Sequence, residues 1–184
     1  TLSSLPLFPL ASVLFPDGLL ALKVFEARYL DLITDCLRRQ RAFGVVCLLQ
    51  GGEVRAGTGL AVRFERVGVL ARLDEVDSEQ PGVLRARCTG TRRFRLDGAA
   101  AQQPDGLWVG SALLLDADEA LAPSAEMRPT VQALANAIAK LKSQGAEPFH
   151  MPHRLGDTGW VANRWCEILP ISLGAKQKLM ELDD

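Results

Sequence analysis

The hydrophobic period of this 184-residue chain changes near Leu115, and that change constrains the fold more than any other feature. Before Leu115, apolar residues mostly alternate with polar ones, and β-branched or aromatic residues stand between turns that contain glycine, as in strands. After Leu115, apolar residues recur at spacings of three and four, as on one face of a helix. The sequence therefore predicts an α+β protein, strand-rich over residues 1–115 and helical over residues 116–184.

The strand-rich part is predicted to form a barrel. Its strand segments are Leu5–Leu10, Leu19–Val24, Phe43–Leu49, Gly59–Leu73 (one or two strands), Val83–Leu96 and Leu107–Leu115, with Gly90 as an expected β-bulge. Only one helix is indicated among them, over about residues 26–39, where apolar residues recur at helical spacing. An open α/β sheet would need a helix after nearly every strand. A closed or nearly closed barrel is favoured instead, because closure removes exposed sheet edges.

The helical part follows a linker rich in Ala, Asp and Pro. Three helices are predicted, over about residues 126–143, 158–169 and 172–182. The last is expected to begin at Ser172, whose hydroxyl can accept a hydrogen bond from a backbone N–H of the first turn.

Composition and charge exclude several classes of protein. Hydrophobic residues make up 48% of the chain and the net charge is −1, which argues against disorder and against a protein built mainly to bind nucleic acid. The four cysteines form no C-x-x-C pair, so reduced and mostly buried thiols are expected. The apolar stretch from Leu2 to Phe25 lacks the basic start of a signal peptide and is interrupted by prolines. We therefore expect a cytoplasmic protein without a membrane span.

Few residues point to catalysis. The two histidines, His150 and His153, could hold a metal with Cys166 or Asp157, but Pro152 between them disfavours a shared helical face, and loop or surface histidines are expected. No serine lies in a G-x-S-x-G turn, and no cysteine has a local nucleophile signature. The sequence predicts neither an enzyme activity nor a metal or cofactor.

Aromatic residues in the last quarter of the chain are candidates for contact with a partner. Trp160 and Trp165 lie five residues apart on a predicted helix, which puts them on different though neighbouring faces. One is expected in the core. The other is a candidate, with Phe149 and Met151, for an exposed apolar patch of the kind that binds partners.

A second candidate contact is the pair Arg92 and Arg93, which stand beside Phe94. The pleat of a strand directs neighbouring side chains to opposite faces, so this basic cluster is split. A solvated face with one arginine packed or paired is favoured over a nucleic-acid contact.

Several segments together resemble one family. The most specific are the proline-bounded start, Leu5-Pro6-Leu7-Phe8-Pro9-Leu10 with Val13-Leu14-Phe15-Pro16, and the segment Phe25-Glu26-Ala27-Arg28-Tyr29-Leu30. Phe43-Gly44-Val45, Gly57-Thr58-Gly59, Gly90-Thr91-Arg92-Arg93-Phe94 and Gln177-Lys178-Leu179-Met180-Glu181 agree as well. With these segments the chain closely resembles the amino-terminal, substrate-binding domain of the Lon ATP-dependent protease family over nearly its whole length.

The resemblance implies a PUA-like β pseudo-barrel with one inserted helix, followed by a carboxy-terminal helical subdomain. A complete Lon protease continues into an ATPase module and a proteolytic module, so a chain of 184 residues looks like the stand-alone Lon-domain type and carries over neither activity. The motif residues have a mainly structural interpretation: prolines set strand starts and a turn, Phe25 and Tyr29 anchor the inserted helix, and Glu26 with Arg28 pair locally or cap.

The main hypothesis is therefore a non-enzymatic recognition module. It would bind unfolded or flexible protein segments or a partner protein, with an ATP-dependent protease as one candidate partner, through apolar surface between the two parts and flanking arginines. The alternative is an RNA-binding PUA-like domain, favoured by the 14 basic side chains, 13 of them Arg, against 12 acidic ones in residues 1–115. The oligomeric state stays open.

Overall fold

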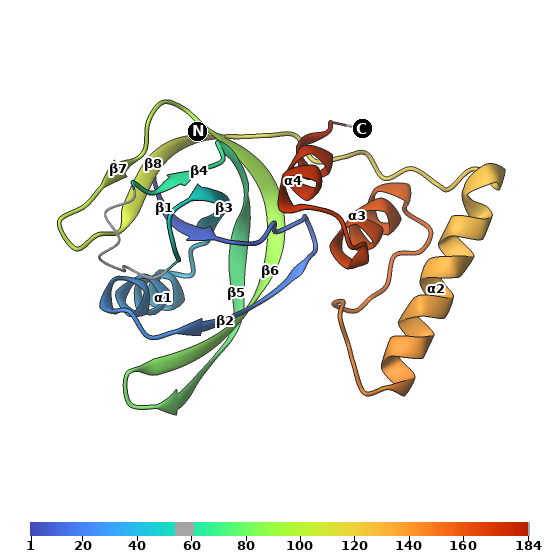
Figure 1. Ribbon diagram of the computed structural model, residues 1–184, viewed down its shortest axis with the longest axis horizontal. Coiled ribbons are helices and arrows are strands. Elements are labelled where there is room, and N and C mark those ends of the chain that lie inside the picture. The colour runs from blue at the N-terminus through green and yellow to red at the C-terminus, as the bar shows by residue number, and fades with distance from the viewer. Residues whose placement is uncertain (54–60, 184) are drawn as a thin grey trace.

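The computed structural model describes residues 1–53 and 61–183 (Figure 1). Its strands are β1 (Leu2–Leu10), β2 (Leu19–Val24), β3 (Phe43–Gln50), β4 (Arg63–Phe64), β5 (Val67–Gln80), β6 (Val83–Leu96), β7 (Ala101–Gln102) and β8 (Trp108–Leu114). The segment Gly57-Thr58-Gly59 and the start of the strand predicted at Gly59–Leu73 lie outside the described residues.

Five of these strands form a closed ring. β6 pairs with β5, β5 with β3, β3 with β1, β1 with β8, and β8 again with β6. All of these pairings are antiparallel except that of β1 with β3. The predicted α+β fold with a pseudo-barrel is thus confirmed.

β2 lies outside the ring because β6 is long enough to pair with two strands, β2 and β8, along the edge opposite β5. The first half of β6 pairs with β2, from Val24 opposite Leu84 to Leu19 opposite Thr89. The second half pairs with β8. One edge of β2 is therefore occupied by β6, and among the described residues no strand pairs with its other edge.

The inserted helix, α1 (Ala27–Arg39), covers the larger of two apolar clusters of the sheet. Its buried side chains include Tyr29, Leu32, Ile33 and Cys36, which recur at the predicted helical spacing. The Tyr29 ring stacks on that of Phe8 of β1, with ring centroids 3.9 Å apart. These contacts hold the start of α1 against the barrel.

A β-bulge in β6 lies beside Gly90, as predicted. Ala71 of β5 is opposite Gly90, whereas Val69 is opposite Arg93, so β6 carries an extra residue between these two pairs. The bulge changes the parity of the strand: Cys88 before it packs in one apolar cluster, and Phe94 after it packs in the other. Gly90 itself is in contact with the loop after β1, because a Cβ atom at Gly90 would lie 2.2 Å from the carbonyl oxygen of Phe15.

The remaining elements are a short 3-10 helix, η1 (Ala125–Met127), and three helices, α2 (Arg128–Ser143), α3 (Thr158–Ile168) and α4 (Leu173–Glu181). Ser172 caps α4 as predicted, since its side-chain oxygen accepts a hydrogen bond from the Ala175 N–H at 3.1 Å. In Figure 1, α3 and α4 lie nearer the sheet than α2 does. The division of the chain at residue 115 into two units stays a prediction. Within residues 1–53 and 61–183, no helix combines the length and hydrophobicity that a membrane crossing requires.

Candidate functional site

The loop between β1 and β2 joins the sheet to α3. The guanidinium of Arg164 on α3 is 1% exposed, and its Nη2 donates to the carbonyl oxygen of Pro16 at 2.7 Å and to Glu167 Oε1 at 2.8 Å. Gly18 leaves room for this pair, because a Cβ atom there would lie 2.6 Å from Glu167 Oε1. Phe15, Pro16 and Gly90 of the family motif therefore contribute to this joint, a role that the sequence did not indicate.

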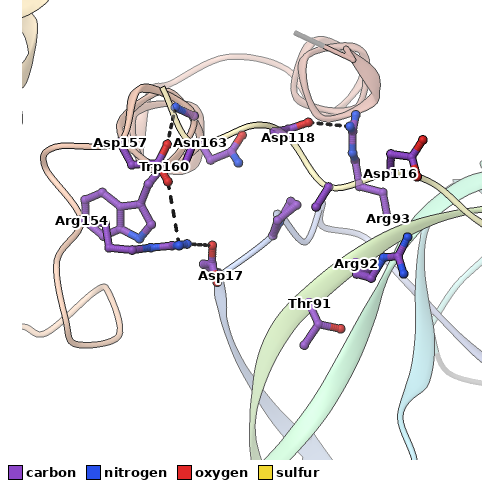
Figure 2. A pocket seen from close by; sticks show the side chains of 14 residues that line it. Asp17, Thr91, Arg92, Arg93, Asp116, Asp118, Arg154, Asp157, Trp160 and Asn163 are labelled. Atoms are coloured by element: carbon purple, nitrogen blue, oxygen red, sulfur yellow. Dashed lines mark hydrogen bonds and ion pairs between the residues drawn. The ribbon is translucent and has the colours of Figure 1, made fainter. Parts of the chain in front are cut away.

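A pocket of about 240 Å³ lies at this joint, and we call it the junction pocket (Figure 2). Its charged lining is mixed: Asp17, Asp116, Asp118, Asp157, Arg92, Arg93 and Arg154. Figure 2 shows Arg154 reaching between Asp17, with which it pairs, and Asp157, whose Oδ2 lies 3.8 Å from Arg154 Nη1. The surface between sheet and helices is therefore polar and internally paired, whereas an apolar surface was expected there.

The two candidate arginines differ in their environments. Arg93 is buried and holds the carboxyl end of α4: it donates to the carbonyl oxygens of Met180, at 3.3 Å, and Leu182, and pairs with Asp118 at 2.6 Å. Arg92 is exposed and donates to the Leu115 carbonyl oxygen at 2.8 Å. Because the buried arginine is committed to internal partners, the structure does not favour an RNA contact through this pair.

The candidate aromatic patch is mostly internal. Phe149 and Trp160 are buried and pack edge to face, with ring centroids 6.1 Å apart. Trp165 is partly buried against the same cluster, and its Nε1 donates to the Thr130 carbonyl oxygen at 3.3 Å. Met151 is 76% exposed and is the one member of the four that presents most of its surface to solvent.

Met151 borders a second polar cavity, of about 480 Å³, which also contains His150. The Thr89 hydroxyl donates to Asp74 Oδ2 at 2.5 Å and lies 3.0 Å from His150 Nε2. Because this hydroxyl directs its proton at Asp74, it can only accept from the imidazole, so His150 is not placed to act as a base for it. Among the described residues, no group of three or more His, Cys, Asp and Glu is arranged to hold a metal ion.

A third cavity, of about 310 Å³, is different in character, and we call it the β2 groove. Its apolar lining comes from β1, β2 and the start of α1: Phe8, Leu10, Leu20, Leu22, Val24, Phe25 and Tyr29. The polar residues of its lining are Ser12, Lys23, Glu26 and Glu53. A mostly apolar groove with a few polar groups in its lining is the form that ligand and peptide sites commonly take.

The start of α1 builds one wall of the β2 groove. Glu26 Oε2 pairs with Arg28 Nε at 3.3 Å, and Arg28 Nη1 donates to the Gly106 carbonyl oxygen at 2.9 Å. The Arg28 guanidinium also lies over the Tyr29 ring, 4.5 Å from its centroid. Burial raises the pKa of Tyr29 to about 12, and the charge of Arg28 offsets part of that rise.

The anchoring role predicted for Phe25 is wrong. Its side chain is 53% exposed and lines the groove, while Tyr29 alone stacks on the barrel. The pleat of β2 explains the difference, since Val24 is the last inward side chain and the next residue must point away. That alternation is readable in the sequence and could have identified Phe25 as a surface residue.

Comparison with known proteins agrees with this architecture. The family model of the ATP-dependent protease La (LON) substrate-binding domain matches residues 4–184. The chain belongs to this family. The Lon resemblance drawn from the sequence is thus confirmed, and the match extends over both the strands and the helices of this Lon domain.

Two solved structures are similar to this Lon domain. The crystal structure of a Lon N-terminal domain protein from Xanthomonas campestris has 33% sequence identity and a TM-score of 0.78, and the alignment covers 100% of this chain and 92% of that one. The N-terminal domain of the Mycobacterium avium complex Lon protease has 17% identity and a TM-score of 0.64, with 99% and 91% covered, and supports the fold alone. No curated protein gives a significant sequence match.

Proposed function

We propose that this domain is a non-catalytic recognition module that binds unfolded or flexible protein segments in the β2 groove. The observation that carries the proposal is the exposed Phe25 side chain within an apolar groove that the family's own motif residues line. The family description, a substrate-binding domain of an ATP-dependent protease, supports a protein as the bound substrate. The four free cysteines fit the reducing conditions of the cytoplasm, where an ATP-dependent protease would be the partner that receives the bound segment.

Apolar burial would supply the affinity. Covering the exposed half of Phe25 removes roughly 100 Å² from water, which contributes about 2.5 kcal/mol at about 25 cal/mol per Å². Binding driven by this term depends little on ionic strength, unlike binding to RNA.

The test is a fluorescence titration with a permanently unfolded protein, reduced and carboxymethylated α-lactalbumin, at about 50 and about 300 mM salt. We expect a dissociation constant of roughly tens of micromolar at both salt concentrations, typical of a weak apolar contact. Phe25→Ser should weaken binding roughly tenfold or more, in line with the lost apolar area.

Leu37→Ser is the matched control. Leu37 is 57% exposed, lies on α1 as an equally accessible apolar residue, and is not part of the groove. Its substitution should leave the affinity unchanged. Absence of binding at these concentrations, or an equal loss in both variants, would contradict the proposal.

A further inference from the structure

The outer edge of β2 presents backbone groups without a strand partner in the described part of the chain. The Gly90 N–H donates to the Gly18 carbonyl oxygen at 2.8 Å, which sets the hydrogen-bond phase of the antiparallel β2–β6 pair. By that phase Leu20, Leu22 and Val24 exchange hydrogen bonds with β6. The N–H and C=O groups of the alternate residues, Leu19, Ala21 and Lys23, therefore point to the open edge.

This open edge borders the β2 groove. Residues 20–24 of β2 line the groove in succession, and Phe25 and Tyr29 continue its wall. A chain that pairs with the edge of β2 would therefore place one of its two faces on the apolar lining. Extended backbone gives such a chain an apolar side chain toward the groove at every second position.

Charged side chains on the other face of the sheet indicate which residues suit the solvent-facing side of an added strand. Lys23 of β2 is opposite Arg85 of β6, and Arg85 is opposite Asp77 of β5, so a row of charges crosses three strands and ends in two cations. Glu79 sits between those cations, but both of its oxygens accept from Arg85, at 2.8 and 3.0 Å. Lys23 Nζ forms a longer ion pair with the same carboxylate, 3.5 Å from Glu79 Oε2, and its side chain is 55% exposed and accessible to a further partner. A chain paired with β2 would place one side chain beside Lys23 in this row, and an acidic side chain there would complement the cation.

We propose that an extended peptide segment adds to the open edge of β2 as a further strand, with apolar side chains in the groove and an acidic side chain beside Lys23. This inference rests on the proposed function and deepens it, because it specifies the conformation and charge pattern of the bound segment. Affinity would then come from main-chain hydrogen bonds as well as from apolar contact.

The first experiment alters the backbone of the peptide and leaves the protein unchanged. The probe is a fluorescein-labelled peptide of about eight residues in which valine alternates with glutamate, long enough to span β2. One version is N-methylated at every valine and a second at every glutamate, because alternate N–H groups of a strand point to opposite edges. We expect one version to bind roughly tenfold or more weakly and the other to bind like the parent, since only one edge pairs with β2.

The identity of the weakened version also reports strand direction. In an antiparallel pair the residue opposite Lys23 shares its face and directs its N–H to β2, so glutamate methylation would weaken binding. In a parallel pair the flanking valines direct their N–H groups to β2, and valine methylation would do so. Either result supports strand addition, whereas equal affinities of both methylated versions and the parent overturn it.

The second experiment exchanges charge. Lys23→Glu should weaken binding of the valine–glutamate peptide and strengthen binding of a valine–lysine peptide, each by roughly threefold or more for one exposed pair. Lys142→Glu, an exposed lysine of α2, makes the same change in net charge away from the groove and should alter neither affinity. If the unfolded protein still binds through Phe25 while methylation and charge exchange have no effect, strand addition is wrong and the proposed function stands. If neither peptide nor unfolded protein binds, both are wrong.

Discussion

Gly90→Ala should destabilise the protein by about 3 kcal/mol, because the added methyl group meets backbone rather than a movable side chain. The Cβ atom would lie 2.2 Å from the Phe15 carbonyl oxygen and 3.1 Å from Leu14 Cγ. Rotation of a side chain cannot relieve the first contact, so the loop after β1 must move away from β6.

The magnitude follows from what that movement breaks. Forcing a methyl group into a packed site costs about 1–3 kcal/mol. Two backbone hydrogen bonds also tie the loop to Gly90, from the Asp17 N–H to the Gly90 carbonyl and from the Gly90 N–H to the Gly18 carbonyl, both at 2.8 Å. Weakening them costs about 1 kcal/mol more, and a total of about 3 kcal/mol lowers Tm by roughly 6–12 °C in a chain of this length.

The assay is urea unfolding followed by tryptophan fluorescence, with Gly156→Ala as the matched control. A Cβ atom at Gly156 would meet nothing within 4 Å, and its backbone does not have the positive φ that favours glycine, so this variant should equal or slightly exceed the wild type in stability. If the free energies of unfolding of the two variants agree within about 0.5 kcal/mol, the reasoning from the Phe15 contact is refuted.

Three further predictions concern single side chains. Arg93→Met should lose about 2–3 kcal/mol of stability in urea unfolding, because it removes charged hydrogen bonds that hold α4. Arg92→Met removes one exposed hydrogen bond and should lose less than about 1 kcal/mol, and equal losses in the two variants would contradict this reasoning. Burial raises the pKa of Glu167 from 4.5 to about 7, although Arg164 lowers it, so the folded state binds this proton more tightly than the unfolded chain. The Glu167 contribution to the free energy of unfolding should therefore fall by about 3 kcal/mol as pH rises through that range. The free energy of unfolding of the wild type, measured relative to that of Glu167→Gln, should accordingly be lower at pH about 8 than at pH about 5. Tyr29 is the single tyrosine, so ultraviolet titration should give one ionisation near pH 12 rather than 10, accompanied by loss of stability above pH 10; a midpoint at 10 in the folded protein would contradict its burial.

The fold class was predictable because the buried faces of the elements determine the hydrophobic period. The helix over α1 and the bulge beside Gly90 follow from apolar spacing and from one glycine in an alternating strand. The second half of β5 was not predicted: the prediction ended at Leu73, but the strand continues to Gln80. This arm projects beyond the core, so its side chains are mostly exposed on both faces and leave no alternation to detect. Paired charges across to β6, such as Arg85 with Glu79, stabilise it instead.

The candidate site was predictable only in part, because burial is decided by contacts between segments far apart in the chain. The sequence indicated that one arginine of the cluster is packed or paired, but not which one, because the covering contact comes from the end of α4, almost ninety residues after Arg93. Trp160 and Phe149 are buried by each other and by α2 for the same reason. Phe25 is the opposite case, since a hydrophobic residue of a strongly patterned segment is exposed, and only the pleat of the preceding strand reveals it.

The family motif therefore divides into two physical groups. The first group lies at the joint between sheet and helices: Phe15 and Pro16 are in the loop after β1, which contacts α3, and Gly90 is at the bulge of β6. Changes in these residues should therefore act on stability. Glu26, Arg28 and Tyr29 instead fix the start of α1, which holds Phe25 open on the β2 groove. If the groove is the binding surface, variants of the first group should lower Tm without changing the affinity of the folded fraction. A variant at Phe25 should do the reverse, and measuring both quantities on the same variants separates a motif that marks a fold from one that marks a site.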